Sequence, residues 1–186
     1  MKAIVELKNT TKVVTNGFNE ERVILDKVNL TIYQGDFITI LGGNGAGKST
    51  LFNVIAGTLP LTSGPGHILG EDVTNWPAEK RAKYLARVFQ DPKMGTAPRM
   101  TVAENLLIAK YRGEGRGLVP RKLSQQIEEF AQLLPRVGNG LEKHLETPAG
   151  LLSGGQRQAL SLLMASLKQP ELLLLDEHTA ALDPKT

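Results

Sequence analysis

The sequence lacks cysteine altogether. This absence excludes a disulfide framework and any zinc or iron–sulfur site built on thiolates, and it fits a reducing compartment. Long apolar runs are missing too, since none exceeds the length of Leu172–Leu175, which is far too short to cross a bilayer. The N-terminal residues hold no apolar stretch long enough for a signal peptide. We therefore expect a cytoplasmic protein that needs a partner for any role at a membrane.

A strong charge of either sign is also absent. The 186 residues include 22 Lys and Arg against 19 Asp and Glu, which leaves a net charge of +3. This weakly basic character is compatible with an anionic ligand or a membrane surface, but it does not indicate nucleic acid binding. The sequence contains no internal repeat, and its length suffices for one compact domain.

Several segments have the patterns of β-strands. Residues 3–7 and 28–33 are apolar or alternating between polar breaks, and Phe37–Leu41 predicts a buried strand that leads into a glycine-rich segment. The run Leu172–Leu175 is typical of a central strand that is buried on both faces.

Helical patterns follow the glycine-rich segment and fill the middle of the chain. Leu51, Val54 and Ile55 have helical spacing, and Thr101 with Glu104 forms a capping box. Two amphipathic helices are indicated by apolar residues at helical spacing: Ile127, Phe130, Ala131 and Leu134, then Leu160, Leu163, Met164 and Leu167. This order of elements predicts an α/β domain with a helical subdomain.

The glycine-rich segment Gly42–Thr50 satisfies the pattern G-x-x-x-x-G-K-[ST]. Polyphosphate must lie against bare backbone N–H groups, so glycines are needed for close approach and unusual dihedral angles. Lys48 would neutralise phosphate charge, Ser49 would offer a hydroxyl to Mg²⁺, and Thr50 would add a phosphate contact. The expected nucleotide-binding residues of this loop are Gly42, Gly43, Asn44, Gly45, Ala46, Gly47, Lys48, Ser49 and Thr50.

Three further motifs carry candidate chemistry. LSGGQ at 152–156 places a serine and two glycines at the start of a helix, which makes another anion site. VFQD at 88–91 places Gln90 at the end of an expected strand. LLLLDE at 172–177 resembles a Walker B strand, in which Asp176 can hold Mg²⁺ directly or through water and Glu177 can orient or activate the attacking water.

In their order, these motifs resemble the Walker A, Q-loop, signature and Walker B motifs of the nucleotide-binding domain of an ATP-binding-cassette (ABC) transporter, and a D-loop follows at 181–183. The resemblance covers essentially the full chain. It implies an α/β fold with a P-loop NTPase core, a mostly parallel sheet flanked by helices, antiparallel N-terminal strands and an inserted helical subdomain. Residues 1–186 would form a single ABC ATPase domain, with its core at about 1–90 and 153–186 and the helical subdomain at about 91–152.

The resemblance also implies a mechanism, the hydrolysis of ATP coupled to transport. Lys48, Gln90 and Glu177 would be catalytic, and Ser49, Gln90 and Asp176 would hold Mg²⁺. Two such domains would face head to tail around two ATP-Mg²⁺, and each signature would close the partner's site through Ser153, Gly154, Gly155 and Gln156.

The partners implied by the resemblance are a second ABC ATPase subunit in a homodimer, transmembrane permease subunits and a substrate-binding protein, with no nucleic acid. The protein would be cytoplasmic and peripheral at the inner face of the cell membrane. The absence of fused membrane helices resembles the bacterial arrangement with separate subunits and favours an importer of a small nutrient.

The sequence departs from the family pattern after the D-loop. A switch histidine normally follows on a further strand, whereas this sequence ends at Thr186, and none of His67, His144 and His178 holds that place. We therefore expect a C-terminally truncated domain that binds ATP but hydrolyses it poorly. His178 stands directly after Glu177, where proline is usual, and we interpret it as a variant of this turn rather than as a catalytic base.

The adenine contact and the basic residues are less defined. The family stacks adenine on an aromatic residue where this sequence has Val14, and the nearest aromatic residue, Phe18, is either an adenine contact or an ordinary loop residue. We expect most basic side chains of the middle region to be solvated, and some to face the permease or the membrane. They are Lys80, Arg81, Lys83, Arg87, Lys110, Arg112, Arg116, Arg121 and Lys122.

Three alternatives make different predictions. A chromosome-maintenance or DNA-repair cassette would carry a long coiled coil between Gln90 and the signature, and residues 91–151 show no sustained heptads. A translation factor of the same superfamily would carry two cassettes. A hydrolysis-defective remnant would bind nucleotide or nothing, and ATP binding with and without Lys48→Ala would separate it from a motor.

Overall fold

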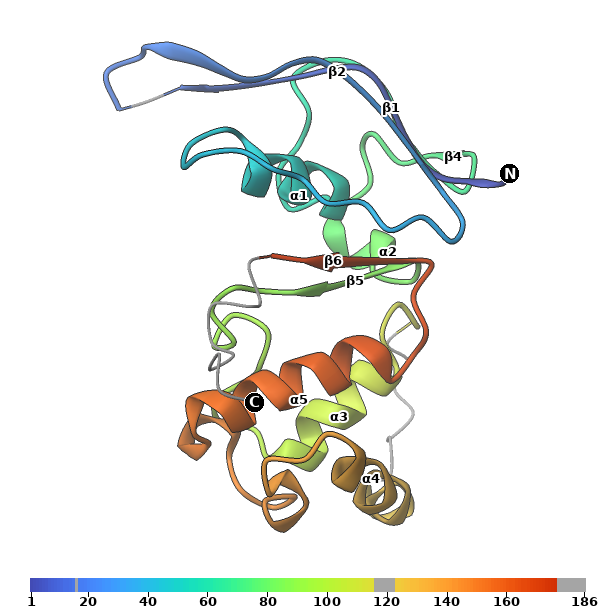
Figure 1. Ribbon diagram of the computed structural model, residues 1–186, viewed down its shortest axis with the longest axis vertical. Helices are drawn as coiled ribbons and strands as arrows, with labels where there is room; N and C mark the ends of the chain where they lie inside the picture. The colour runs from blue at the N-terminus through green and yellow to red at the C-terminus, as the bar shows by residue number, and fades with distance from the viewer. Residues whose placement is uncertain (16, 116–122, 177–186) are drawn as a thin grey trace. The chain divides into compact units, whose positions relative to one another are not determined.

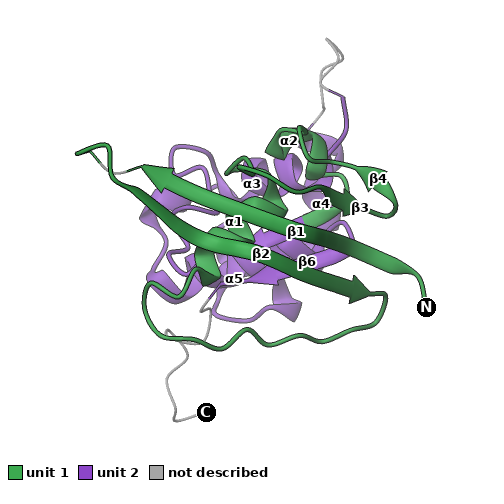
Figure 2. Cartoon of the chain, turned by 90° about the horizontal axis from the view of Figure 1, so that it is seen from above, with its two compact units in different colours: residues 1–85 green, residues 86–186 purple. Residues whose placement is uncertain are grey.

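The computed structural model describes residues 1–15, 17–115 and 123–176, and the chain divides into two compact units, Met1–Leu85 and Ala86–Thr186 (Figure 2). Unit 1 carries an antiparallel sheet, whereas unit 2 is mainly helical with a short two-stranded sheet. None of the helices in the described ranges combines the length and the apolar character that a bilayer crossing requires.

Unit 1 is built on a four-stranded sheet in the order β2-β1-β3-β4. Its long strands β1 (Ala3–Thr15) and β2 (Glu21–Tyr33) pair antiparallel and are drawn in shades of blue in Figure 1. The short strands β3 (Gly66–Ile68) and β4 (Glu71–Asp72) extend the sheet on the other side of β1. Both strands that the sequence predicts in this region are confirmed as parts of β1 and β2, which are longer than expected.

Two helices complete unit 1. The helix predicted after the glycine-rich segment is α1 (Lys48–Ala56), and α2 (Ala78–Arg81) is a single turn. Of the predicted apolar face of α1, Val54 and Ile55 are buried at 1% and 2% exposure, whereas Leu51 is half-buried.

The segment Phe37–Leu41 corrects a prediction from the sequence. It has no regular structure, and Phe37 and Leu41 are 91% and 87% exposed. A buried strand needs hydrogen-bonded neighbours at its edges and side chains packed on both faces. Among the described residues of unit 1, no strand pairs with this segment, so its apolar pattern alone does not make it a strand.

Unit 2 consists of short helical elements around α3 and α5, with β5 beginning at the last residue of unit 1. In chain order its elements are β5 (Leu85–Val88), α3 (Val102–Lys110), η1 (Leu123–Gln125), α4 (Ile127–Leu133), η2 (Leu134–Arg136), η3 (Leu141–Lys143), η4 (Ala149–Leu151), α5 (Gly154–Ser166) and β6 (Leu172–Leu175).

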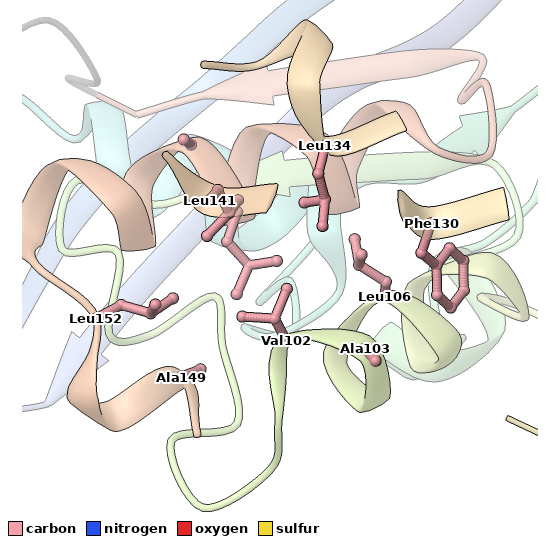
Figure 3. Packing of buried hydrophobic residues seen from close by; sticks show 10 residues of the cluster. Val102, Ala103, Leu106, Phe130, Leu134, Leu141, Ala149 and Leu152 are labelled. Carbon is pink, nitrogen blue, oxygen red and sulfur yellow. The ribbon is translucent and has the colours of Figure 1, made fainter. Parts of the chain in front are cut away.

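The helices of unit 2 enclose an apolar cluster (Figure 3). Leu106 of α3, Phe130 of α4 and Leu160 of α5 are completely buried in it, together with Leu134 and Leu141. Burial of each such side chain contributes about 1.5–3 kcal/mol. The cluster holds the segment before the signature against α3.

The predicted helix starts of unit 2 are confirmed. Thr101 and Glu104 form the expected capping box, since the N–H of Glu104 donates to Oγ1 of Thr101 at 3.2 Å and the N–H of Thr101 donates to Glu104 at 2.7 Å. The buried face of α4 is narrower than the apolar pattern of the sequence predicts, because Phe130 is buried whereas Ala131 is exposed.

The strand predicted at the end of unit 2 is present as β6, and it pairs with β5 in a two-stranded sheet. Only Leu174 of this strand is buried, and Leu173 is 43% exposed. The prediction of a central strand buried on both faces was therefore wrong for the described residues, because these residues place no second strand beside β6 and leave Leu173 exposed.

Candidate functional site

The glycine-rich loop of unit 1 lies exposed ahead of α1. Residues 42–46 are exposed, and Gly45 and Gly47 have φ angles of +79° and +89°. Glycine adopts this left-handed backbone without the steric cost that other residues incur. The N–H of Ala46 donates to the carbonyl oxygen of Gly43 at 3.2 Å, which closes the turn. The loop therefore presents a backbone with few side chains, as phosphate binding requires.

Gly47 also permits a close approach between α1 and β2. A Cβ atom at this position would lie 3.1 Å from the carbonyl oxygen of Ile24 and 3.3 Å from Cδ2 of Leu25, both in β2. The start of α1 is thus set against the sheet. The sequence motif predicts the glycine but gives no indication of this contact.

The side chain of Lys48 folds back over the loop. Its Nζ donates hydrogen bonds to the carbonyl oxygens of Gly42 at 2.7 Å and Gly43 at 3.0 Å. A lysine ammonium is a compact charge on a flexible stem, so it can exchange these carbonyls for phosphate oxygens. The loop and the cation that the sequence predicts are thus brought together within unit 1.

The N-terminus of α1 adds hydrogen-bond donors at the same loop. Gly47 is its N-cap and offers no side chain to the first turn. Helix N-termini with unused N–H groups and a favourable dipole are ready anion sites. Ser49 is exposed in this turn, and Thr50 is half-buried beside it.

In unit 2, Asp176 follows β6 and forms an ion pair with Arg87 of β5. Oδ2 of Asp176 accepts a hydrogen bond from Nη2 of Arg87 at 2.7 Å. The N–H of Asp176 donates to the carbonyl oxygen of Val88 at 3.1 Å, which continues the pairing of the two strands. The predicted magnesium ligand is therefore held at the end of the β5–β6 sheet by both its backbone and its side chain.

The remaining predicted residues of the hydrolysis step are only partly described. Gln90 is exposed just beyond the end of β5. Glu177, His178 and the D-loop residue Asp183 lie outside the described residues. The glycine-rich loop lies in unit 1, whereas Gln90, the signature and Asp176 lie in unit 2.

The signature segment opens α5 through a capping box. The N–H of Gln156 donates to Oγ of Ser153 at 3.2 Å, and the N–H of Ser153 donates to Oε1 of Gln156 at 3.1 Å. Gly154 and Gly155 are exposed, and a Cβ atom at either would meet no atom within 4 Å. These glycines therefore leave an open surface at the N-terminus of the helix.

Two contacts with preceding loops hold the signature segment in place. Nε2 of Gln156 donates to the carbonyl oxygen of Asn139 at 3.2 Å. Arg157, which is 7% exposed, donates from Nε and Nη2 to the carbonyl oxygen of Ala149 at 2.9 and 2.6 Å. The signature is thus tied to the residues that immediately precede it and to the turn at Asn139.

Three of the basic residues are exceptions to the expectation that most of these side chains are solvated. Arg81 is 4% exposed and donates to the carbonyl oxygens of Val54 and Ile55 at the end of α1. Arg112 donates in the same manner to carbonyl oxygens at the end of α5, and Arg87 binds Asp176. Burial lowers the pKa of the Arg81 and Arg112 guanidinium groups, because desolvation disfavours the charged form. Local sequence patterns could not identify these roles, since these acceptors lie 26 to 89 residues away along the chain.

The adenine contact stays a prediction with its two interpretations. Val14 is part of β1, and Phe18 is 88% exposed in the connection to β2. A large exposed aromatic ring fits stacking on a base, and its exposure fits an ordinary loop residue as well.

The chain matches the family model described as "ABC transporter" over residues 25–180. It is 43% identical over 183 residues to the "Tyrosine transport ATP-binding protein" of Clostridioides difficile. This alignment covers 98% of this chain and 72% of that protein. It is 39% identical to the "Spermidine/putrescine import ATP-binding protein PotA" of Haemophilus ducreyi, over 99% of this chain and 45% of that protein. The chain therefore spans less than half the length of PotA.

Solved structures give the same result for the fold. The dimeric post-hydrolysis state of the ATP-binding cassette MJ0796 bound to ADP and Pi superposes with a TM-score of 0.80 at 28% identity, over 98% of this chain and 77% of that one. The cbiO1 protein of Clostridium perfringens, part of the ABC transporter complex cbiONQ, superposes with a TM-score of 0.71 at 26% identity. The superposition covers 99% of this chain and 69% of that one.

Proposed function

Because the chain belongs to the ABC transporter family, we propose that Gly42–Thr50 binds ATP-Mg²⁺ and that this chain powers transport through a separate permease. The family, the fold class and the transport ATPase function predicted from the sequence are confirmed by the family model and the relatives. The roles of individual residues, of magnesium and of the partners are what we propose.

The arrangement of Lys48 at the phosphate loop is the observation that carries the proposal. The ammonium lies within 3.0 Å of two loop carbonyl oxygens, at the N-terminus of a helix whose N-cap is a glycine. A polyphosphate in this loop would meet backbone N–H groups, a helix dipole and a mobile cation together. The phosphates would draw Lys48 away from the carbonyls of Gly42 and Gly43, because a charge-assisted hydrogen bond is stronger than one to a neutral acceptor.

The donor set fits magnesium, which prefers oxygen ligands. Ser49 presents an exposed hydroxyl, and Asp176 presents a carboxylate in which only Oδ2 is bonded by a described residue. Gln90 would contribute its amide oxygen, and Glu177 would orient the attacking water. Bound Mg²⁺ supplies charge neutralisation on the phosphate oxygens.

The signature would act on a second copy of the chain. Ser153 and the exposed Gly154 and Gly155 form the open N-terminus of α5, which suits a phosphate group carried by a partner. We propose that two copies associate head to tail around two ATP-Mg²⁺, with residues 91–152 as the helical subdomain. The permease would be bound at the inner face of the membrane, and a small nutrient would be imported, in keeping with the names of the tyrosine transport and spermidine/putrescine import relatives.

Calorimetric titration of the chain with ATP in Mg²⁺ tests the phosphate loop. We expect Lys48→Ala to weaken ATP binding at least tenfold, since it removes a charge-assisted contact to phosphate. Lys2→Ala is the matched control, because it removes the same charge from an exposed end of unit 1. Equal ATP affinity in all three proteins would contradict the assignment of this loop.

A further inference from the structure

The pairing of Arg87 with Asp176 brings a cation against the carboxylate proposed to hold magnesium. Nη2 of Arg87 lies 2.7 Å from Oδ2 of Asp176, and the two side chains are only 10% and 16% exposed. A hydrogen bond between two charged groups is about twice as strong as one between neutral groups, and burial reduces its screening by solvent. The carboxylate is therefore occupied by a strong partner within the protein itself.

The position of Arg87 is fixed by its strand and by a contact of its side chain with an aromatic ring. Its backbone is part of β5, and the N–H of Asp176 donates to the carbonyl oxygen of the next residue, Val88. Its guanidinium lies over the ring of Phe89, with Cζ 4.6 Å from the ring centre. A guanidinium stacked on an aromatic face retains its planar donors for a carboxylate. The ion pair is thus a built arrangement and not a chance contact of two long surface side chains.

We propose that Arg87 is a positioning residue that competes with Mg²⁺ for the carboxylate of Asp176. This inference rests on the proposed role of Asp176 as a magnesium ligand. Without Mg²⁺, Arg87 holds the carboxylate through Oδ2 and neutralises it. When Mg²⁺ binds, the carboxylate shares its charge between two cations, so its attraction for each of them is weakened. Arg87 therefore lowers the affinity for Mg²⁺ and sets how strongly magnesium promotes ATP binding.

The measurement that tests this competition is the magnesium gain, defined as the ATP dissociation constant in EDTA divided by that in Mg²⁺. By linkage, a change in the affinity of the site for Mg²⁺ appears as an equal change in this ratio. Arg87→Gln keeps a hydrogen-bond donor but removes the charge. We expect it to raise the magnesium gain about tenfold, the size of the effect of one hydrogen bond to a charged group. A purely structural defect would weaken ATP binding with and without Mg²⁺ alike.

Two controls show whether the effect passes through Asp176. Arg99→Gln removes the same charge from an exposed position of unit 2 and should leave the magnesium gain unchanged. In the Asp176→Asn background, Arg87→Gln should have no effect on the gain, since neither cation then has a carboxylate to share. If Arg87→Gln fails to fold, Arg87→Lys replaces it. Its ammonium lacks the planar fork, so we expect a gain two- to threefold above wild type.

The outcomes separate this inference from the function on which it rests. A magnesium gain of the Arg87 variant at or below wild type, or an equal rise in the Asp176→Asn background, overturns the competition alone. If Asp176→Asn itself leaves the gain at the wild-type value, Asp176 is not a magnesium ligand, and both the proposed role and the inference are overturned.

Discussion

Nη1 of Arg81 lies 2.8 Å from the carbonyl oxygen of Val54, which joins α2 to the last turn of the helix that begins at the phosphate loop. The same guanidinium also donates to Ile55, and its other nitrogens donate to the carbonyl oxygens of Val73 and Trp76. Carbonyls at a helix C-terminus lack intrahelical donors, and a cation there complements the helix dipole. Arg81 thus acts as a buried C-terminal cap of α1.

Arg81→Met should destabilise unit 1 by about 3 kcal/mol, because it leaves several buried carbonyl groups without donors. Trp76 is the only tryptophan of the chain and lies in unit 1, so its fluorescence during denaturant unfolding reports on this unit. Arg81→Lys is the control that keeps the charge, and we expect a smaller loss because one ammonium cannot reach both segments. Wild-type stability of Arg81→Met would contradict the capping role.

Gly47→Ala should destabilise unit 1 by about 2 kcal/mol. An alanine at φ +89° adopts a left-handed backbone that costs about 1–2 kcal/mol, and its Cβ atom would lie 3.1 Å from the carbonyl oxygen of Ile24. Gly43→Ala is the matched control in the same loop, since a Cβ atom there meets nothing within 4 Å. Tryptophan fluorescence during urea unfolding measures both variants, and equal losses in the two would argue against a specific contact with β2.

Ser153→Asp should separate the structural and functional roles of the signature. Aspartate is as good an N-cap as serine and complements the helix dipole, so the free energy of unfolding should change by less than about 0.5 kcal/mol. Its negative charge would repel the phosphates of a partner's ATP, so ATP-dependent association of two chains should be lost. Light scattering with ATP-Mg²⁺ measures association, and circular dichroism measures unfolding.

Ser153→Ala is the reverse control. It removes the cap and should destabilise α5 by about 1 kcal/mol without adding charge. If the Ser153→Asp variant associated with ATP as well as the wild type does, the signature would not face a partner's phosphate.

The stability of the β3–β4 region should depend on pH in the acidic range. The pKa of Asp72 lies below its usual value, because the carboxylate accepts hydrogen bonds from the side chain and the N–H of Thr74. A lowered pKa in the folded state means that this stabilisation is present above the unfolded-state pKa of about 3.9 and is lost as the pH falls through the folded pKa. An NMR titration of Asp72 should give a midpoint below the usual value, and Thr74→Val should raise it. A midpoint that does not respond to Thr74→Val would exclude this cause.

The sequence predicted the features that depend on neighbours within one turn. The capping box at Thr101 and the helix start at Ser153 were correct because a helix start joins residues only three positions apart. The helix predicted to follow the glycine-rich segment was also correct, since its apolar spacing is local to the helix. The prediction for Phe37–Leu41 failed because burial of a strand depends on neighbours that its own residues do not specify.

By itself, the sequence determined the family, the order of the motifs and the residues that we propose for phosphate binding, because these depend on residue type and short spacing. Only the tertiary structure decided what the arginines do. Arg81 reaches a carbonyl 27 residues away, and Arg87 reaches a carboxylate 89 residues away. A guanidinium on a long side chain satisfies whichever acceptors the fold brings to it, and no local pattern records which acceptors those are.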